Sequence, residues 1–267
     1  SGMGMCGDTH LENLYIGRNI RYSATDSDGY SPFYNLTSLK NVTFSNAGMV
    51  TECNDYLLAG CSTVENLSLP ESLVTIGNHT FSDMTTLQYC RMFDNVESVG
   101  EYGFAGDVNL TDLTFSKKVK TLRNNLFMNC TSLPLFTVHP AVTSIEDNAF
   151  MNCNSLATLS FTDSNDLLNI GRRNENGNFA AMFSDSPVQS LYLSRWLIYN
   201  IDEESYAPFY NRSTLTDLRF GETLGDIGKF LFEKCSSIAT VNIPGVESIG
   251  EKAFYDCTAL SGLTFNS

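Results

Sequence analysis

One phrase recurs along the whole chain: Phe, two residues, Cys, two residues, Leu, two residues, Leu, one residue, and a final Phe, Leu or Ile. Residues 150–161 and 254–265 are complete copies. The leading positions follow one another at spacings of 25, 23, 23, 23, 23, 33, 26, 23 and 22 residues. A fixed period of this length is the signature of a repeat solenoid, whose thin units bury their apolar faces against their neighbours. The leading positions are Phe33, Leu58, Phe81, Phe104, Phe127, Phe150, Phe183, Phe209, Phe232 and Phe254.

Each phrase ends in an alternation of apolar and polar residues, which is the period of a β-strand. Leu11, Leu14 and Ile16 match the tail of an earlier copy, so the sequence predicts a parallel strand face of about eleven rungs. The Ala-Phe-x-x-Cys stretch has apolar residues three apart, and we expect it to form one-turn helical segments. A Val/Leu-x-x-Ile/Val pair precedes most of the phenylalanines. Gly often follows this pair, where the backbone needs a tight turn.

The repeat also bounds the domain organisation. Residues 6–267 are expected to form a single solenoid that is truncated at both ends, because Cys6 stands where a Phe belongs and Ser267 lies two residues past a strand phrase. Residues 1–5 are interpreted as a cloning remnant or a disordered start. The repeat is interrupted by insertions at 162–183 and 194–209, and it is irregular near 17–33.

Charge excludes two classes of partner. The chain carries 30 acidic and 16 basic residues, for a formal net charge of −14. Nucleic-acid binding depends on clustered Lys and Arg, so no nucleic-acid partner is expected. An anionic membrane surface is disfavoured for the same reason. No apolar run approaches the length of a membrane span, so direct membrane insertion is not expected.

The repeat resembles the BspA-like leucine-rich repeats of surface and secreted proteins. The family phrase Ser-Val-x-x-Ile-Gly-x-x-Ala-Phe-x-x-Cys-x-x-Leu is nearly reproduced by residues 246–260. The resemblance implies a right-handed leucine-rich-repeat coil without a cofactor, at the cell surface or secreted. It also implies binding or adhesion to a protein or glycan on a host or neighbouring cell. A passive structural spacer within a larger surface protein is the alternative, because a fold alone does not specify a ligand.

The eight cysteines occupy core slots of the repeat. Five of them fill the same inward position, and the others replace a strand Leu, an Ile before Gly, and a Phe. Stacked slots would hold their Cβ vectors parallel, which keeps the sulfurs away from disulfide geometry. We therefore expect free, buried thiols that act as small apolar groups. A disulfide framework is the less favoured reading, and a zinc site is less favoured still.

The sequence contains no catalytic motif, and we predict that the protein is not an enzyme. No nucleophile elbow, phosphate loop or dinucleotide fingerprint occurs, and the three histidines stand outside any motif. The acidic inserts offer weak metal candidates. Asp26, Asp28, Asp202 and Glu204 could give oxygen ligands to calcium, although solvated acidic loop tips are the favoured interpretation.

The residues that point outward from the strands carry the ligand hypothesis. Most are small and polar, but four rungs carry Tyr or Arg, which are enriched at binding hot spots. High strand propensity is the alternative reason for Tyr. Trp196 lies just beyond a strand in the second large insertion, where it could contact a ligand or cover a widened coil. The candidate ligand-binding residues are Tyr15, Tyr89, Arg91, Tyr192, Trp196, Asp217 and Arg219.

Overall fold

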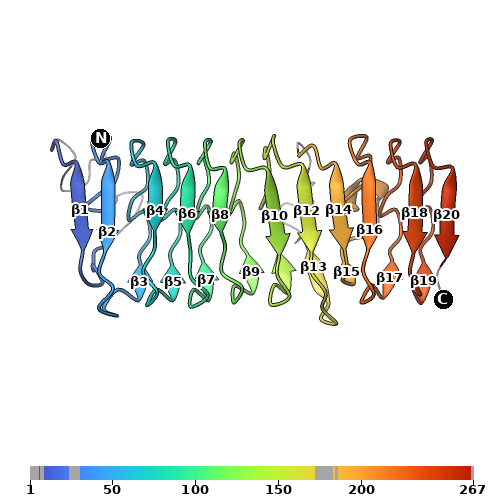
Figure 1. Cartoon of the computed structure of the whole chain (residues 1–267), viewed down its shortest axis with the longest axis horizontal. Coiled ribbons are helices and arrows are strands. Elements are labelled where there is room, and N and C mark those ends of the chain that lie inside the picture. The colour runs from blue at the N-terminus through green and yellow to red at the C-terminus, as the bar shows by residue number, and fades with distance from the viewer. Residues whose placement is uncertain (1–5, 7–8, 24–30, 172–182, 184–185, 266–267) are drawn as a thin grey trace. The chain divides into compact units, whose positions relative to one another are not determined.

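The computed structural model describes residues 6, 9–23, 31–171, 183 and 186–265. The chain divides into two compact units, Ser1–Leu133 and Pro134–Ser267. Each unit consists of short parallel strands joined by turns (Figure 1). Within the described ranges, no helix has the length and apolarity that crossing a lipid bilayer requires.

The first unit carries two sets of strands. The longer set pairs in parallel as β1–β2 and as β4–β6–β8, and the shorter set pairs as β3–β5–β7. The longer strands are β1 (Asn13–Ile16), β2 (Asn41–Phe44), β4 (Asn66–Ser68), β6 (Tyr89–Arg91) and β8 (Asp112–Thr114). The shorter strands are β3 (Glu52–Cys53), β5 (Thr75–Ile76), β7 (Ser98–Val99) and β9 (Thr121–Leu122).

The second unit repeats this plan. Its longer strands pair as β10–β12–β14–β16 and as β18–β20, and its shorter strands pair as β11–β13–β15 and as β17–β19. The longer strands are β10 (Leu135–Val138), β12 (Thr158–Phe161), β14 (Ser190–Leu193), β16 (Asp217–Phe220), β18 (Thr240–Ile243) and β20 (Gly262–Phe265). The shorter elements are β11 (Ser144–Ile145), β13 (Leu168–Ile170), β15 (Leu197–Ile198), the 3₁₀ helix η1 (Glu204–Tyr206), β17 (Asp226–Ile227) and β19 (Ser248–Ile249).

The repeat phrase predicted the longer strands correctly. All eleven expected segments form strands, and in all of them except the last, β20, the side chains alternate between more buried and more exposed positions as a strand requires. In β18, for example, Val241 and Ile243 are buried while Thr240 and Asn242 are exposed. The shorter strands were not predicted. Their only signal in the sequence is the Val/Leu-x-x-Ile/Val pair that precedes the phenylalanines.

The leading phenylalanines form continuous stacked rows inside each unit. In the first unit the ring of Phe104 lies 5.5 Å from Phe81 and 5.8 Å from Phe127. In the second unit the rings from Phe150 to Phe254 succeed one another at centroid distances of 5.4–5.8 Å. Offset aromatic pairs at this spacing add stability beyond the area they bury. The repeat period thus places one ring per coil in a common interior row.

The expected one-turn helical segments are wrong, because these stretches are chains of turns. In each of several successive coils, two residues four positions apart have left-handed backbone conformations, and this conformation breaks a right-handed helix. Alternate N–H groups also leave the coil: those of Tyr56, Leu58 and Gly60 donate to the carbonyls of Asn78, Thr80 and Ser82 in the next coil. The left-handed pairs are Tyr56/Gly60, His79/Asp83, Tyr102/Gly106, Asn125/Asn129 and Asn148/Asn152 in successive coils.

The cysteine slot of the repeat has a hydrogen-bonding role. All eight cysteines lie in the described part of the chain and are free; seven are buried, and only Cys6 is half-buried. In several coils the thiol donates to the carbonyl of the leading residue one coil earlier, as Cys130 Sγ does to Phe104 O at 3.0 Å. The same bond is made by Cys61 to Phe33, Cys235 to Phe209, Cys257 to Phe232 and, with a hydroxyl, Ser186 to Phe150.

Asp107 occupies the same slot with a carboxyl group and is fully buried. Its Oδ1 accepts from the Met84 N–H at 2.9 Å. In other coils the backbone N–H of the residue equivalent to Met84 donates to the carbonyl three residues back, as Cys130 N does to Phe127 O. Asp107 Oδ2 is buried without a hydrogen-bond partner among the described residues. Burial raises the pKa of this carboxyl group well above its ordinary value, and the charge of Asp83 adds to the rise.

Candidate ligand-binding surfaces

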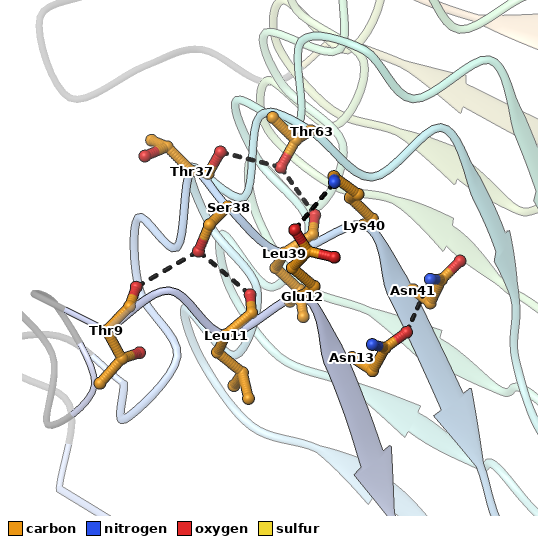
Figure 2. Close-up of polar contacts among 10 residues, drawn as sticks. All are labelled: Thr9, Leu11, Glu12, Asn13, Thr37, Ser38, Leu39, Lys40, Asn41 and Thr63. Carbon is orange, nitrogen blue, oxygen red and sulfur yellow. Dashed lines mark hydrogen bonds and ion pairs between the residues drawn. The ribbon is translucent and has the colours of Figure 1, made fainter.

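Many hydroxyl groups beside the longer strands are already engaged in holding coils together. Figure 2 shows Ser38 Oγ donating to the carbonyls of Thr9 and Leu11 at 3.3 and 3.1 Å. Thr63 Oγ1 likewise donates to the carbonyls of Thr37 and Leu39, at 3.0 and 2.7 Å. These side chains fasten one coil to the one before it. Such Ser and Thr residues are therefore explained by structure, and they are poor candidates for a ligand site.

The strand face of the first unit carries the predicted Tyr and Arg residues at separate points. Tyr15 on β1 is 67% exposed, and its ring lies over Gly17. On the same side of the strands, Asn41 Nδ2 donates to Asn13 Oδ1 at 2.7 Å (Figure 2). Tyr89 and Arg91 project from β6, and the Arg91 guanidinium stacks 4.5 Å above the ring of Phe93. Each of these groups is accessible, but no polar contact joins Tyr15 to the other two.

The strand face of the second unit brings three predicted residues together on neighbouring strands. Tyr192 on β14 lies opposite Arg219 on β16, and Ser190 lies opposite Asp217. Ser190 Oγ donates to Asp217 Oδ2 at 2.7 Å, and Arg219 Nη2 lies 3.2 Å from the same oxygen. These side chains are exposed, so the ion pair adds little to stability. The arrangement fixes an Arg, a carboxylate and a Tyr in one polar patch.

Asp163 extends this patch beyond β12. Tyr192 Oη donates to Asp163 Oδ1 at 2.7 Å. Hydrogen bonds from the hydroxyls of Ser194 and Tyr192 lower the pKa of the Asp163 carboxyl group. Burial and the neighbouring acceptor Asp163 raise the pKa of Tyr192. The Tyr192 phenol therefore stays protonated at neutral pH, and its hydrogen bond to the Asp163 carboxylate sets its orientation. The sequence analysis did not predict a role for Asp163.

A buried arginine lies at the second insertion. Arg195 has no exposed surface, and its guanidinium donates to three backbone carbonyls. These are Val142 O at 2.6 Å, Asp166 O at 3.2 Å and His139 O at 3.3 Å. Its Nε is buried without a partner among the described residues. Burial lowers the pKa of Arg195, and the carboxylate of Asp166 partly offsets this effect. An arginine keeps its proton at any physiological pH, so this is a buried positive charge.

In the two coils around Arg195, the pattern of buried and exposed positions shifts by one residue. Val142 and Leu224 lie two residues before the paired positions of β11 and β17, and they are 1% and 3% exposed. At the same slot in the two coils between them, Leu167 is 43% exposed and Trp196 is 39% exposed. The following residues, Leu168 on β13 and Leu197 on β15, are buried in their place. Two apolar side chains that other coils hide are thus displayed on the surface.

Trp196 both faces solvent and covers the next coil. A Cβ on Gly225 would lie 2.8 Å from the Trp196 ring, so only glycine leaves room for the indole there. Ile198 is 44% exposed at the outward position of β15, where the paired positions of the neighbouring short strands hold Ser144, Asn169, Asp226 and Ser248. We call the exposed side chains of Leu167, Trp196 and Ile198 the Trp196 surface.

The acidic inserts differ in what the structure shows. Asp26 and Asp28 lie outside the described residues. Glu204 begins η1, and its carboxylate pairs with the ammonium groups of Lys252 and Lys234. The hydrogen bond from Lys252 and the two positive charges lower the pKa of Glu204. A carboxylate neutralised by two lysines is a poor calcium ligand, so Glu204 gives the calcium hypothesis no support. Asp202 is exposed, and calcium binding by it stays a prediction.

The described residues show no metal-binding cluster. No group of three or more His, Cys, Asp and Glu in the described ranges could hold a metal ion. One ring cluster was not predicted: His79 stacks between Tyr56 and Tyr102 at centroid distances of 4.7 and 4.4 Å. These three residues occupy one equivalent turn position in successive coils, so they form a ladder of rings on the turn side.

The fold and the repeat together define a leucine-rich-repeat solenoid. The BspA-type leucine-rich repeat model matches residues 9–134, 51–173 and 179–267 in overlapping copies. The chain therefore belongs to the BspA-type leucine-rich repeat family, whose repeats typically serve as non-catalytic binding modules. No curated protein matches the chain.

Solved structures of leucine-rich repeat proteins resemble the chain. A protein from Bacteroides ovatus is 21% identical over 96% of this chain and 73% of its own, with a TM-score of 0.54, which shows a shared fold. A T. pallidum leucine-rich repeat protein is 17% identical over 79% and 82% of the two chains, with a TM-score of 0.48. A leucine-rich cell surface protein from Faecalibacterium prausnitzii is 16% identical over 96% and 88%, with a TM-score of 0.40.

Proposed function

We propose that this chain is an extracytoplasmic, non-catalytic binding or adhesion module that contacts a protein or glycan through its longer strands and the flanking inserts. The observation that carries the proposal is the polar patch of Tyr192, Asp217 and Arg219 on β14 and β16. Its groups are held in place before a ligand arrives, which lowers the entropic cost of binding. Tyr and Arg are also the side chains that most often dominate binding energy.

The test uses a glycan microarray and, in parallel, a panel of purified extracellular-matrix proteins. The labelled chain should bind a member of one set, and replacing Tyr192 and Arg219 with Ala should weaken that binding by about tenfold or more. Arg219 is exposed and Tyr192 is half-buried, and neither belongs to the apolar core, so the variant should keep the circular dichroism spectrum of the parent. Thr240→Ala and Asn242→Ala on β18 are the matched controls, since both residues are exposed on a longer strand outside the patch.

The alternative is a passive spacer. In that case neither probe set yields a ligand, and outward substitutions on the strands are harmless.

The proposal extends to the strand face of the first unit, where Tyr15, Tyr89 and Arg91 are tested by the same arrays. Loss of binding in Tyr89→Ala and Arg91→Ala, with Tyr192 and Arg219 intact, would move the ligand site to the first unit. Accessibility of the chain to protease on intact source cells tests the extracytoplasmic location.

A further inference from the structure

The Trp196 surface has a structural origin that points to a partner. In the coils of β13 and β15, Leu168 and Leu197 replace Leu167 and Trp196 in the interior. Arg195 is fully buried, and its guanidinium donates to the carbonyls of His139 and Val142, which lie between β10 and β11, and to the carbonyl of Asp166. A buried charge costs free energy even when it is well bonded. The coils that contain this buried charge also expose the indole of Trp196 and the aliphatic side chains of Leu167 and Ile198.

Carboxylates flank the surface on both sides. Asp166 directly precedes Leu167 and is exposed. On the other side, Asp226 opens β17 beside the Gly225 on which the indole rests, and the exposed Glu247 donates its N–H to the Gly225 carbonyl at 2.9 Å. Asp202 and Glu203 are exposed a few residues beyond Ile198. Lys229, two residues after the end of β17, is paired with Glu251 at 3.0 Å.

We propose that the Trp196 surface docks a segment of another protein in which apolar anchor residues are flanked by Lys or Arg. The apolar side chains would hold the anchors, and the carboxylates around them would pair with the basic flanks. Charge separates this partner from two others. A second copy of the chain would bring the same carboxylates together, and the chain as a whole carries a net charge of −14. An anionic lipid surface would be repelled for the same reason.

The chain supplies its own probe, because Trp196 is its only tryptophan. The titrant is a synthetic peptide of Leu and Phe flanked by Lys, and its partner peptide carries Glu in place of each Lys. The Lys peptide should shift the Trp196 emission to shorter wavelength as the indole is covered, and added salt should weaken the effect. The Glu peptide should leave the emission unchanged. Equal responses to both peptides would overturn the proposal.

Variants locate the binding. Ile198→Thr restores the polar residue type that neighbouring coils carry, and it should weaken binding of the Lys peptide by about tenfold. Trp196→Ala, followed by the anisotropy of labelled peptide, should do the same. Leu135→Thr is the matched control, because Leu135 is 57% exposed on β10, away from the shorter strands. If Leu135→Thr and Ile198→Thr bind the peptide equally well, general charge attraction explains the binding and the proposal fails.

Two further measurements separate the alternatives. Sedimentation of the unliganded chain should show a monomer, whereas a dimer lost in Ile198→Thr would assign the surface to self-association and overturn the proposal. Emission shifts with zwitterionic lipid vesicles would assign it to a membrane instead. The double variant of Tyr192 and Arg219 should bind the Lys peptide normally, so the strand-face function and this docking surface can fail independently.

Discussion

Replacing Asp107 with Asn is expected to stabilise the first unit increasingly as the pH rises above about 4. Cysteine or serine in the equivalent slot of other coils donates to a Phe carbonyl, and Asp107 can do this only when it is protonated. Its Oδ1 already accepts from Met84, and its Oδ2 is buried without a partner among the described residues. The titratable groups facing it are Asp83, whose charge opposes ionisation, and the Cys90 thiol, whose pKa is raised by burial and by Asp107 and which is therefore neutral. The geometry therefore favours a neutral carboxylic acid in the native state.

The size of the effect follows from proton linkage. The pKa of Asp107 is raised in the folded state, so the native protein binds one proton that the unfolded chain releases at about pH 3.9. Its contribution to stability is fully present below that pH and is lost as the pH rises through the folded-state pKa. The loss is about 1.4 kcal/mol per pH unit across this window. Asn is neutral at every pH, so the advantage of Asp107→Asn should grow by the same amount per unit.

The assay is urea unfolding followed by far-ultraviolet circular dichroism at a series of pH values. Titrating groups that do not interact with Asp107 are common to both proteins, so they cancel in the difference between variant and parent. Asp112→Asn on β8 is the matched control, because it makes the same substitution at an exposed position on a strand of the same unit. Infrared spectra should also show a protonated carboxyl band that persists above about pH 4 and is absent from Asp107→Asn. Stability curves for parent and Asp107→Asn that stay parallel as the pH rises above about 4 would refute the reasoning.

Three other outcomes are expected. A thiol reagent at pH 8 should label only Cys6 quickly in the native protein, because burial raises the pKa of thiols such as Cys61 to about 12. In denaturant the reagent should find eight thiols, and a count of two or fewer would contradict free cysteines. Gly100→Ala should destabilise by about 1–3 kcal/mol in urea unfolding, because its Cβ would lie 2.5 Å from the Asn78 backbone nitrogen. Arg195→Ala should lower the free energy of unfolding by about 3 kcal/mol, because it leaves three carbonyls without their donor. Unfolding is followed by the fluorescence of Trp196, and an unchanged midpoint would show that the carbonyls find other donors.

Part of the candidate site could be predicted from sequence. Tyr192, Asp217 and Arg219 were placed outward because side chains alternate along a strand, and the structure puts all three on one face of neighbouring strands. Their partner Asp163 could not be predicted, because it lies 29 residues from Tyr192 and follows β12 outside the repeat phrase. Trp196 was singled out as a residue of the insertion, but its neighbours Leu167 and Ile198 were not.

The sequence by itself determined the elements that obey the repeat: the strand positions, the row of Phe104 and Phe127, and the inward cysteines. These follow from a local apolar pattern, since each coil can bury that pattern only against an identical neighbour. Tertiary structure alone decided the departures. Left-handed residues such as Tyr56 turned the expected helical segments into turns, because their N–H groups bond to the next coil. Arg195 became a core residue because carbonyls more than 50 residues away in the chain accept hydrogen bonds from its guanidinium, and the next residue, Trp196, is exposed.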